Sequence, residues 1–373
     1  MRIGFDAKRA FNNTRGLGNY SRDLIRIMLE HYPNNAYFLY SASEKIRFIS
    51  EHVGNASIVH PQNAVWNTFP SVWRSFGIPF QYEAKELDIF HGLSNEIPMN
   101  LTKRKTKTVL TMHDLIFLKM PELYNIPDRI LYRKKYLGSC ERADAVIAIS
   151  EQTKKDLIEF TQMDENKISV IHQGCNPIFY QEVHQEAIKR VKEKHQLPEQ
   201  YFLTVGAIEA RKNHGLIVEA LKISKIDMPL VIIGRPSGDG LIELQKLISD
   251  HHLQDQVLIR QQIPTEDLPA IYHAAALFVY PSLYEGFGIP LLEALNCGVP
   301  VIGSKGSCLE EAGGPSSKYI DPYNAEELAD TMTQICSNNE LRNQMIQDGY
   351  QHTMKFSDQV IASKINDLYE KLL

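Results

Sequence analysis

Residues 277–296, LFVYPSLYEGFGIPLLEALN, contain the pattern that decides the fold. Leu277–Tyr280 is a short apolar run typical of a buried strand. A loop interrupted by two glycines follows, and Pro290 then opens a segment with helical spacing that ends at Asn296. A strand that leads through a loop into a helix is the repeating unit of a parallel sheet covered by helices.

The same alternation occurs in two rounds along the 373 residues. The first round has strand candidates at Arg2–Asp6, Ala36–Ser41, Asp88–His91, Thr108–Met112, Ala145–Ile149 and Ile168–His172. The second has them at Tyr201–Val205, Leu230–Ile233, Val257–Ile259, Leu277–Tyr280, Val299–Ile302 and Lys318–Ile320. The chain is therefore expected to be α/β, with two doubly wound domains over residues 1–175 and 176–356.

Composition limits the classes of function. Forty Lys and Arg residues against 45 Asp and Glu give a net charge of −5, which argues against a dedicated nucleic-acid binder. The five cysteines are widely spaced and no Cys-x-x-Cys pair occurs, as in reduced cytosolic proteins. The first residues do not resemble a secretory signal, and no apolar run approaches the ~20 residues of a membrane span. We therefore expect a cytoplasmic protein.

Several common signatures are absent from the sequence. It contains no Gly-Lys dipeptide, which excludes a P-loop, and no intact G-x-G-x-x-G after the first strand. It also lacks an Asp-x-Asp metal–nucleotide clamp, a G-x-S-x-G elbow and an H-E-x-x-H helix. The chemistry must therefore come from other residues at the strand ends.

Three of these strand ends lie in the first half. Gly16 and Gly18 stand just before a long amphipathic segment, where backbone N–H groups could approach an anion. A plain glycine turn is the alternative. His113 ends an apolar strand and could donate to a substrate oxygen, or be a structural histidine paired with Asp114. A third strand end, at Ser150, has a helix N-cap as its default interpretation.

The second half contains stronger signals. Arg211 and Lys212 precede a predicted helix, where cations oppose the helix dipole at a cost of roughly 0.3–1 kcal/mol each. That placement favours a bound phosphate over a solvated surface pair. Glu285 on the loop and Glu293 one turn into the next helix could accept hydrogen bonds from sugar or ribose hydroxyls, with helix caps or solvent pairs as the alternative.

Together these residues resemble glycosyltransferase family 4, a family of retaining enzymes, and within it the mannosyltransferase-like branch. The resemblance runs from Gly16 through His113 and Arg211 to the Glu285–Pro290 stretch and Glu293. It implies the GT-B fold, with two Rossmann-like domains facing across a cleft. Acceptor would bind chiefly to the first domain and nucleotide sugar to the second. The last helix, residues 357–373, would return to the first domain.

The resemblance also implies roles for single residues. Four would act on the reacting groups: His113 would contact the transferred sugar, Arg211 and Lys212 would neutralise the donor diphosphate, and Glu285 would bond the sugar hydroxyls. The others would bind substrate: Gly16 and Gly18 at the diphosphate, the main-chain amides of Phe287, Gly288 and Ile289 at the sugar, Glu293 at the ribose, and Gln262 and Ile263 beside the base.

One position departs from the family pattern. Many relatives carry an arginine directly after the glycine that ends the first strand of the second domain, and here that residue is Ala207. Arg211 is the cation that could supply the missing charge from the other side of the turn. If it does not, Lys212 and the helix dipoles alone would stabilise the diphosphate.

The expected substrates follow from the same resemblance. GDP-mannose is the first expectation for the donor and UDP-sugars remain open, while the acceptor would be a growing polysaccharide or a lipid-linked oligosaccharide. No metal and no cofactor are expected. The cationic run Lys103–Lys107, with the aromatic-rich stretch Trp66–Phe80 upstream, could contact the inner face of an anionic membrane or form a solvated loop.

Two other functions remain open at this stage. A sugar-nucleotide epimerase on the same two-domain scaffold would convert the donor without any acceptor. A regulator that binds a nucleotide sugar without turnover is the second alternative.

Overall fold

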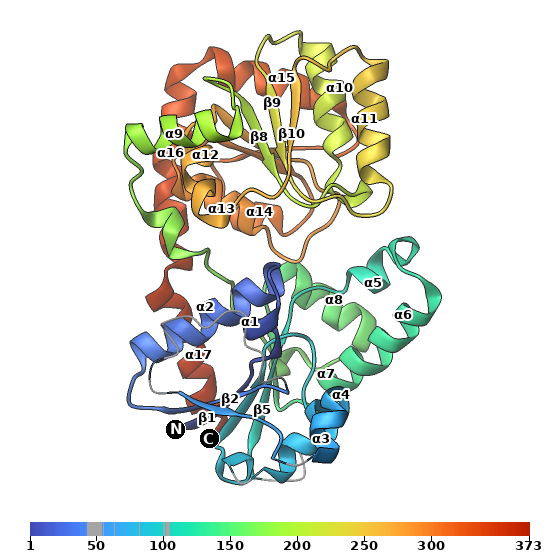
Figure 1. The fold of residues 1–373 in the computed structure, drawn as a ribbon, viewed down its shortest axis with the longest axis vertical. Coiled ribbons are helices and arrows are strands. Elements are labelled where there is room, and N and C mark those ends of the chain that lie inside the picture. Colours follow the sequence, from blue (N-terminus) through green and yellow to red (C-terminus); the bar gives the residue numbers. More distant parts are fainter. Residues whose placement is uncertain (43–53, 55, 63, 82, 100, 102–104) are drawn as a thin grey trace. The chain divides into compact units, whose positions relative to one another are not determined.

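The computed structural model describes the chain except for residues 43–53, 55, 63, 82, 100 and 102–104. The described residues form two compact units, shown in Figure 1. Unit 1 comprises Met1–Gly174 together with Phe356–Leu373, and unit 2 comprises Cys175–Lys355. Each unit is built on one parallel sheet.

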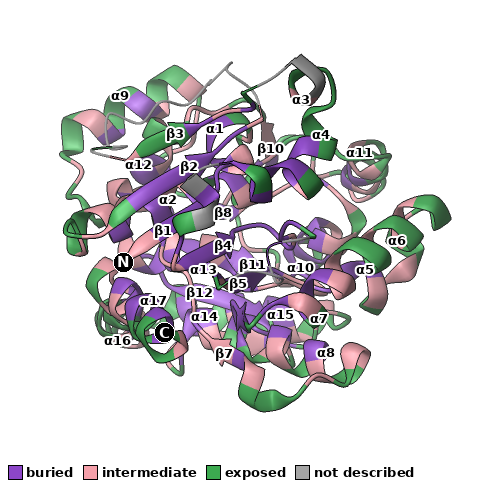
Figure 2. Cartoon of the chain, turned by 90° about the horizontal axis from the view of Figure 1, so that it is seen from below, coloured by how far each residue is buried: buried purple, intermediate pink, exposed green. Residues whose placement is uncertain are grey.

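The sheet of unit 1 has seven strands in the order β3-β2-β1-β4-β5-β6-β7. All of its strand pairs are parallel. The strands are β1 Arg2–Asp6, β2 Ala36–Tyr40, β3 Ser57–Val59, β4 Ile89–Gly92, β5 Lys107–Met112, β6 Ala145–Ala148 and β7 Ile168–Val170. Strands β1, β4 and β5 are almost wholly buried, as Figure 2 shows, because helices cover a parallel sheet on both faces.

The helices of unit 1 include two long ones. These are α2 Gly16–His31 and α17 Asp358–Leu372, and the shorter α-helices are α1 Lys8–Asn12, α3 Ala64–Thr68, α4 Pro70–Val72, α5 Ile116–Lys119, α6 Ile126–Tyr132, α7 Gly138–Arg142 and α8 Glu151–Thr161. Single turns of 3-10 or π type lie at Trp73–Gly77, Ile78–Phe80, Glu83–Glu86, Pro121–Leu123, Arg133–Leu137, Glu165–Lys167 and Met354–Phe356.

The last helix is tied to unit 1 by specific bonds. Tyr369 of α17 lies 2.6 Å from Nδ1 of His91 on β4, and Asp358 forms a 2.8 Å ion pair with Arg26 of α2. Ile361, Ile365 and Tyr369 are buried. Helix α17 therefore belongs to the core of unit 1, although it follows unit 2 in the sequence.

Unit 2 contains a six-stranded parallel sheet in the order β10-β9-β8-β11-β12-β13. Its strands are β8 Phe202–Val205, β9 Leu230–Ile233, β10 Val257–Arg260, β11 Leu277–Tyr280, β12 Val301–Ser304 and β13 Lys318–Ile320. Its α-helices are α9 Gln185–His195, α10 His214–Ser224, α11 Gly240–Asp250, α12 Leu268–His273, α13 Ile289–Asn296, α14 Leu309–Gly313, α15 Ala325–Ser337 and α16 Asn339–Thr353, with 3-10 turns at Pro177–Tyr180, Ala210–Lys212 and Thr265–Asp267.

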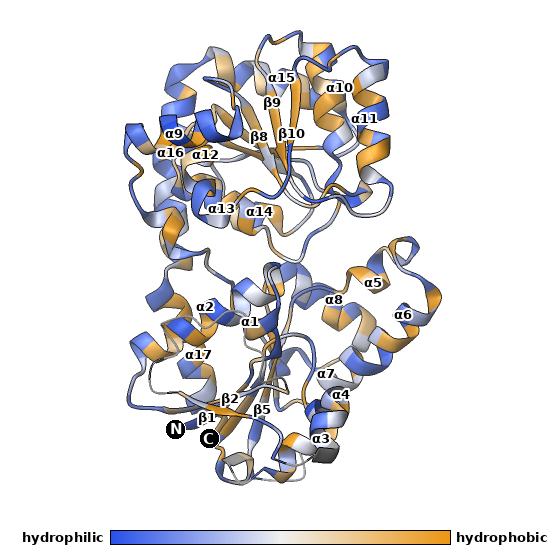
Figure 3. Ribbon diagram, in the orientation of Figure 1, coloured by the Kyte–Doolittle hydropathy of each residue, from blue (hydrophilic) through white to orange (hydrophobic). Residues whose placement is uncertain are grey.

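The core of unit 2 explains why its strands are visible in the sequence. Phe202, Leu230 and Val279 are fully buried between the sheet and helices such as α10 and α15. In Figure 3 the strands β8, β9 and β10 are mostly hydrophobic, whereas α10 and α11 carry a hydrophobic and a hydrophilic side. The predicted α/β class with two doubly wound domains is confirmed.

Two details differ from the sequence prediction. The expected helix from Arg129 to Arg142 is broken by a π turn at Arg133–Leu137, between α6 and α7. Strand β3 and helix α9 were not predicted. Helix α9 buries only Ile188 and Val191, too few positions to produce a clear helical period.

Candidate functional site

The best-formed polar cluster lies at the carboxyl ends of β8 and β11. These strands are neighbours in the sheet of unit 2, and the chain proceeds from β8 to one side and continues past β11 to the other. In open parallel sheets, ligands bind at this point of reversal, beyond the carboxyl ends of the strands. The loops after β8 and β11 carry Arg211, Lys212 and Glu285.

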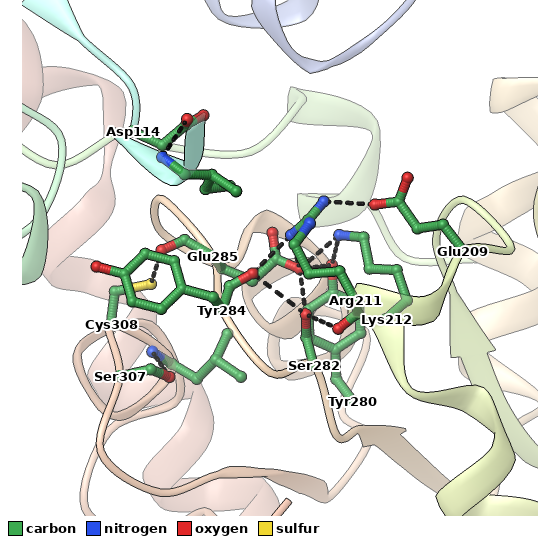
Figure 4. Close-up of polar contacts among 12 residues, drawn as sticks. Asp114, Glu209, Arg211, Lys212, Tyr280, Ser282, Tyr284, Glu285, Ser307 and Cys308 are labelled. Atoms are coloured by element: carbon green, nitrogen blue, oxygen red, sulfur yellow. Dashed lines mark hydrogen bonds and ion pairs between the residues drawn. The ribbon is translucent and has the colours of Figure 1, made fainter. Parts of the chain in front are cut away.

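Main-chain bonds hold these two loops together. The N–H of Leu283 donates to the carbonyl of Arg211 at 2.9 Å, and the hydroxyl of Ser282 donates to the same carbonyl at 3.1 Å. In return, Nη1 of Arg211 donates to the carbonyl of Tyr284 at 2.6 Å. The loops therefore form one rigid base for the side chains drawn in Figure 4.

Glu285 is the centre of the cluster. Its Oε1 lies 2.6 Å from Nζ of Lys212, 2.9 Å from Nη1 of Arg211 and 2.6 Å from the hydroxyl of Ser282 (Figure 4). The hydroxyl of Tyr280 donates to the same oxygen at 3.2 Å. Among the contacts of the described residues, these side chains all reach Oε1 and none reaches Oε2.

The charges of the cluster depend on one another. Burial would raise the pKa of Glu285, but the positive charges of Lys212 and Arg211 lower it to about 2. Burial lowers the pKa of Lys212 despite the attraction of Glu285. Burial also opposes the charge of Arg211, but Glu285 and Glu209 raise its pKa. The cluster thus brings Arg211 and Lys212 onto the shared carboxylate of Glu285, with Glu209 as a second partner of Arg211.

Lys212 is far less exposed than a loop lysine would be. Only 9% of the residue is accessible, and its Nζ lies 2.5 Å from the hydroxyl of Tyr280 and 5.0 Å from the centre of that ring. A Cβ at Gly206 would lie 3.6 Å from the aliphatic stem of Lys212. The alternative of a solvated surface pair is therefore wrong for this residue.

Helix α13 places Glu293 in a different environment. Its N-cap, Gly288, has φ of +130°, and a Cβ there would lie 2.9 Å from Leu309, so the turn requires glycine. The hydroxyl of Tyr272 on α12 donates to Oε2 of Glu293 at 2.8 Å. Burial raises the pKa of Glu293 to about 7, although the bond from Tyr272 opposes this. Glu293 therefore exchanges its proton near neutral pH.

Replacing Glu293 by Gln should make unfolding less dependent on pH. The carboxyl group binds its proton more tightly in the folded chain, at pKa about 7, than in the unfolded chain, at roughly 4.3. The free energy of unfolding of wild type should therefore fall as pH rises between these values. The stability of Glu293→Gln relative to wild type should increase from pH 5 to pH 8. Urea denaturation of both proteins at pH 5 and at pH 8 measures this. The same difference in unfolding free energy between variant and wild type at the two pH values would contradict it.

His113 lies in the loop after β5 of unit 1, and its ring is held on two sides. Nε2 lies 2.9 Å from the carbonyl oxygen of Leu93. Tyr20 packs edge-on against the ring, with 4.6 Å between the two ring centres. Burial, helped by the charge of Arg9, lowers the pKa of His113 to about 4, although the bond to Leu93 opposes this. Because a carbonyl only accepts, Nε2 carries the proton and Nδ1 is an acceptor in the neutral ring. The ring of His113 bonds Leu93, and Asp114 accepts from the N–H of Ile116, so the alternative of a His113–Asp114 pair is wrong.

This geometry predicts a fixed tautomer for His113. Nitrogen-15 spectra should show the Nε2–H form of the neutral ring from pH 8 down to pH 5, because the pKa of about 4 lies below this range. The ring signals of His195, whose Nε2 is bonded to Asp267 in unit 2, provide an internal comparison for the ring signals of His113. A His113 ring that is doubly protonated at pH 6 would contradict this assignment.

The two glycines of the first loop lie inside α2 and not before it. The helix starts at Gly16, and the N–H of Gly18 already donates to the carbonyl of Arg15 at 2.8 Å. A Cβ at Gly18 would lie 1.9 Å from the carbonyl oxygen of Asn13, so this glycine permits a close backbone contact. Placing both glycines ahead of the helix was wrong, since both lie in the first turn of α2.

The other predicted binding residues are placed as follows. Phe287 is buried, while Ile289 is the first residue of α13, so both lie beside the Glu285 loop. Gln262 is exposed in the loop after β10, with φ of +58°, and Ile263 follows it. Strand β10 is separated from β8 by β9, so Gln262 and Ile263 lie away from the cluster on the sheet. Ser150 caps α8 by accepting from the N–H of Thr153, as predicted.

Four hydrogen-bonding partners of these residues were not predicted from the sequence. Ser282 and Tyr280 bond Glu285, Glu209 bonds Arg211, and Tyr272 bonds Glu293. Ser282 directly follows Pro281 at the end of the strand, and this position could have indicated that its hydroxyl belongs to the site. Tyr272 carries no such signal, because an aromatic residue in a helix is more often part of a core.

Comparison with known families decides where this chain belongs. Residues 185–352 match the family described as Glycosyl transferases group 1, and residues 45–178 match Glycosyltransferase Family 4. The chain belongs to glycosyltransferase family 4. The two matched regions cover most of unit 2 and much of unit 1, and the first contains Arg211, Lys212, Glu285 and Glu293.

Similar proteins include two mannosyltransferases of Escherichia coli. The serotype-specific mannosyltransferase WbdA is 30% identical over 76% of this chain and 36% of its own length. The O-antigen chain mannosyltransferase B is 28% identical over 76% of this chain and 74% of its own length. The family 4 chain thus spans about a third of the length of the WbdA proteins that it matches.

A solved structure shares the fold of this family 4 chain. The structure of Anabaena HepE in complex with UDP has a TM-score of 0.76 over all of both chains, at 17% identity. This likeness confirms the predicted GT-B fold. Among the helices of the described residues, none has the length and apolar character to cross a bilayer.

Proposed function

We propose that this chain transfers a hexose from a nucleoside diphosphate sugar to a glycan or lipid-linked acceptor, with retention of anomeric configuration. GDP-mannose is the proposed donor, and a UDP-sugar is the rival. The names of the E. coli relatives, which are mannosyltransferases, support mannose. The presence of UDP in the HepE structure keeps the rival open.

One observation carries this proposal: Arg211 and Lys212 both bond the carboxylate of Glu285 at the carboxyl ends of β8 and β11. When a nucleoside diphosphate leaves the sugar, negative charge grows on the leaving oxygen. Preorganised cations at that position stabilise the transition state more than the ground state. Arg211 and Lys212 supply two positive charges at this place, held in the free chain by Glu285 and, for Arg211, also by Glu209.

Glu285 would position the transferred sugar. Its Oε1 is occupied by Lys212, Arg211 and Ser282, whereas Oε2 takes none of the side-chain contacts given above. Because the pKa of the Glu285 carboxyl is about 2, its oxygens remain hydrogen-bond acceptors throughout the physiological pH range. We assign Oε2 as the atom that accepts hydrogen bonds from the sugar hydroxyls.

The proposed reaction needs no nucleophile from the chain. The bond between the anomeric carbon and the diphosphate oxygen breaks, the acceptor oxygen attacks from the same face, and a donor phosphate oxygen takes the proton of the acceptor. The neutral Nδ1 of His113 would accept a hydrogen bond from the sugar. We propose that Arg211 and Lys212 provide the charge that a metal ion supplies in other transferases.

The proposed location is the cytoplasm, with contact at the inner face of the membrane. Phe69 and Phe80 of the aromatic-rich stretch are 56% and 62% exposed, which is unusual for phenylalanine in water. Lys105 is exposed as well, whereas Lys103 and Arg104 lie outside the described residues.

Membrane contact through this stretch predicts a loss of vesicle binding on substitution. Phe69→Ser with Phe80→Ser should abolish sedimentation with phosphatidylglycerol vesicles, because apolar insertion and charge attraction act together. Tyr323→Ser, at a residue of unit 2 that is 79% exposed, is the matched control. Unchanged sedimentation of the double variant would contradict the membrane contact.

A nucleotide panel followed by product analysis tests the proposed function. GDP, UDP and ADP are compared by thermal shift, since a ligand at a hundred times its Kd stabilises by ~2.7 kcal/mol. The preferred donor is then incubated with and without acceptor. A new epimer of the donor without acceptor would show an epimerase. Binding without hydrolysis or transfer would show a regulator, and either result would overturn the proposal.

A further inference from the structure

A surface pocket of about 330 Å³ in unit 1 lies outside the cluster described above. It is found where β1 and β2 end: Lys8 and Arg9 follow β1, and Ser41 follows β2. Asn12, Asn13 and Ser71 also line it. Ala42 and Pro70 complete the lining. Ligand pockets commonly have volumes of roughly 300–1,000 Å³, so this one has room for a small group.

The charges around this pocket are unbalanced. The nearest carboxylates are already used, because Asp6 and Glu96 both bond Arg74, Asp6 at 2.5 Å and Glu96 at 3.1 Å. Among the salt bridges of the described residues, none includes Lys8 or Arg9. Two adjacent cations thus line a pocket whose other polar groups are amides and hydroxyls.

Further observations show that this region has a positive potential. Burial lowers the pKa of Lys8, and the charges of Arg74 and Arg9 lower it further. The Nε of Arg9 is buried and has no hydrogen-bond partner. A buried donor without a partner is unfavourable, and a bound anion would satisfy it.

The pocket belongs to unit 1, the same unit as His113, which is the residue proposed to contact the transferred sugar. The charge of Arg9 contributes to the lowered pKa of His113. A ligand bound at Lys8 and Arg9 is therefore a ligand of the unit that the resemblance assigns to the acceptor.

We propose that the pocket of Lys8 and Arg9 binds a phosphoryl group of the acceptor, so that the acceptor is a sugar phosphate or a lipid-linked sugar diphosphate. Arg and Lys with amide donors beside them fit the several oxygens of a phosphoryl group. This inference rests on the proposed transfer activity and names the class of acceptor for it.

Tryptophan fluorescence tests the pocket without any turnover. Both tryptophans of the chain, Trp66 and Trp73, lie in unit 1, on either side of Ser71, so unit 2 is silent. Titration with mannose 1-phosphate should change the emission of wild type, and Lys8→Met with Arg9→Gln should weaken binding at least tenfold. Galacturonate, which carries a carboxylate, should bind at least tenfold more weakly than the phosphate. Equal binding of the two would overturn the phosphoryl assignment.

Kinetics with a matched control separates the acceptor from the donor. Lys8→Met with Arg9→Gln should raise KM for a phosphorylated acceptor at least tenfold and leave KM for the donor and for an uncharged glycoside unchanged. Arg133→Gln with Lys134→Gln, two adjacent exposed cations of unit 1, is the control. A rise in donor KM alone would place the donor diphosphate in the pocket and overturn the proposal.

Two comparisons complete the test. A lower KM for a polyprenyl-linked sugar diphosphate than for the soluble sugar phosphate would identify the lipid-linked form, and the reverse would identify the soluble one; both support a phosphoryl site. If wild type neither hydrolyses nor transfers any donor sugar, the proposed function fails. The fluorescence titration still decides whether the pocket binds phosphate.

Discussion

Replacing Lys212 by Met should lower kcat for sugar transfer by about 10²–10³-fold. This is the usual cost of removing one group that stabilises developing charge, about 2.7–4 kcal/mol in the barrier. The ammonium is 90% or more buried and lies 2.6 Å from Glu285, so water cannot easily replace it. Lys212→Arg should recover part of the rate because it restores the charge.

The matched control for this variant is Lys305→Met. Lys305 also pairs with a glutamate, Glu327, but both side chains are substantially exposed, so its removal should leave kcat within twofold. Circular dichroism and Tm show whether each variant is folded. A folded Lys212→Met enzyme with wild-type kcat would contradict the role of Lys212.

Glu285→Gln should have two effects of opposite sign, with tighter binding of GDP and slower transfer. In the free chain Glu285 competes with any diphosphate for Lys212 and Arg211. Without its charge the buried Lys212 loses its carboxylate partner, while Arg211 keeps Glu209. The chain is therefore destabilised, by about 3–5 kcal/mol for a broken buried pair, and binds an anion more strongly. Transfer slows because the sugar loses the acceptor oxygen that orients it.

Thermal shift and kinetics measure the two effects together. The increase in Tm on adding GDP should be larger in Glu285→Gln than in wild type, while kcat falls at least tenfold. Glu310→Gln, a change in unit 2 at a glutamate that bonds only a backbone N–H among its described contacts, should alter neither. Weaker GDP binding in Glu285→Gln would mean that Glu285 assists the diphosphate directly, contrary to the model.

Much of the fold is predictable because strands buried on both faces are uniform apolar runs. Leu230–Ile233 and Leu277–Tyr280 are strands in the structure with the predicted bounds. The short strand β3, Ser57–Val59, has two exposed residues out of three and so lacks that signal. Helix boundaries were less accurate where the backbone changes type, as at the π turn Arg133–Leu137.

The site was predictable as a set of residues but not as a set of bonds. Lys212 and Glu285 stand 73 positions apart, and only the neighbouring positions of β8 and β11 bring them within 2.6 Å. The sequence likewise could not show that the ring Nε2–H of His113 donates to the carbonyl of Leu93, which leaves Nδ1 as the acceptor of the neutral ring. The roles assigned to these residues stay predictions.

The central claim is that Arg211 and Lys212 bind the diphosphate of the donor. Calorimetric titration of GDP and GMP into wild type and Lys212→Met tests it most directly. The account predicts that wild type binds GDP at least tenfold more tightly than GMP, and that Lys212→Met loses this preference. Equal affinity for GDP in the two proteins would contradict it.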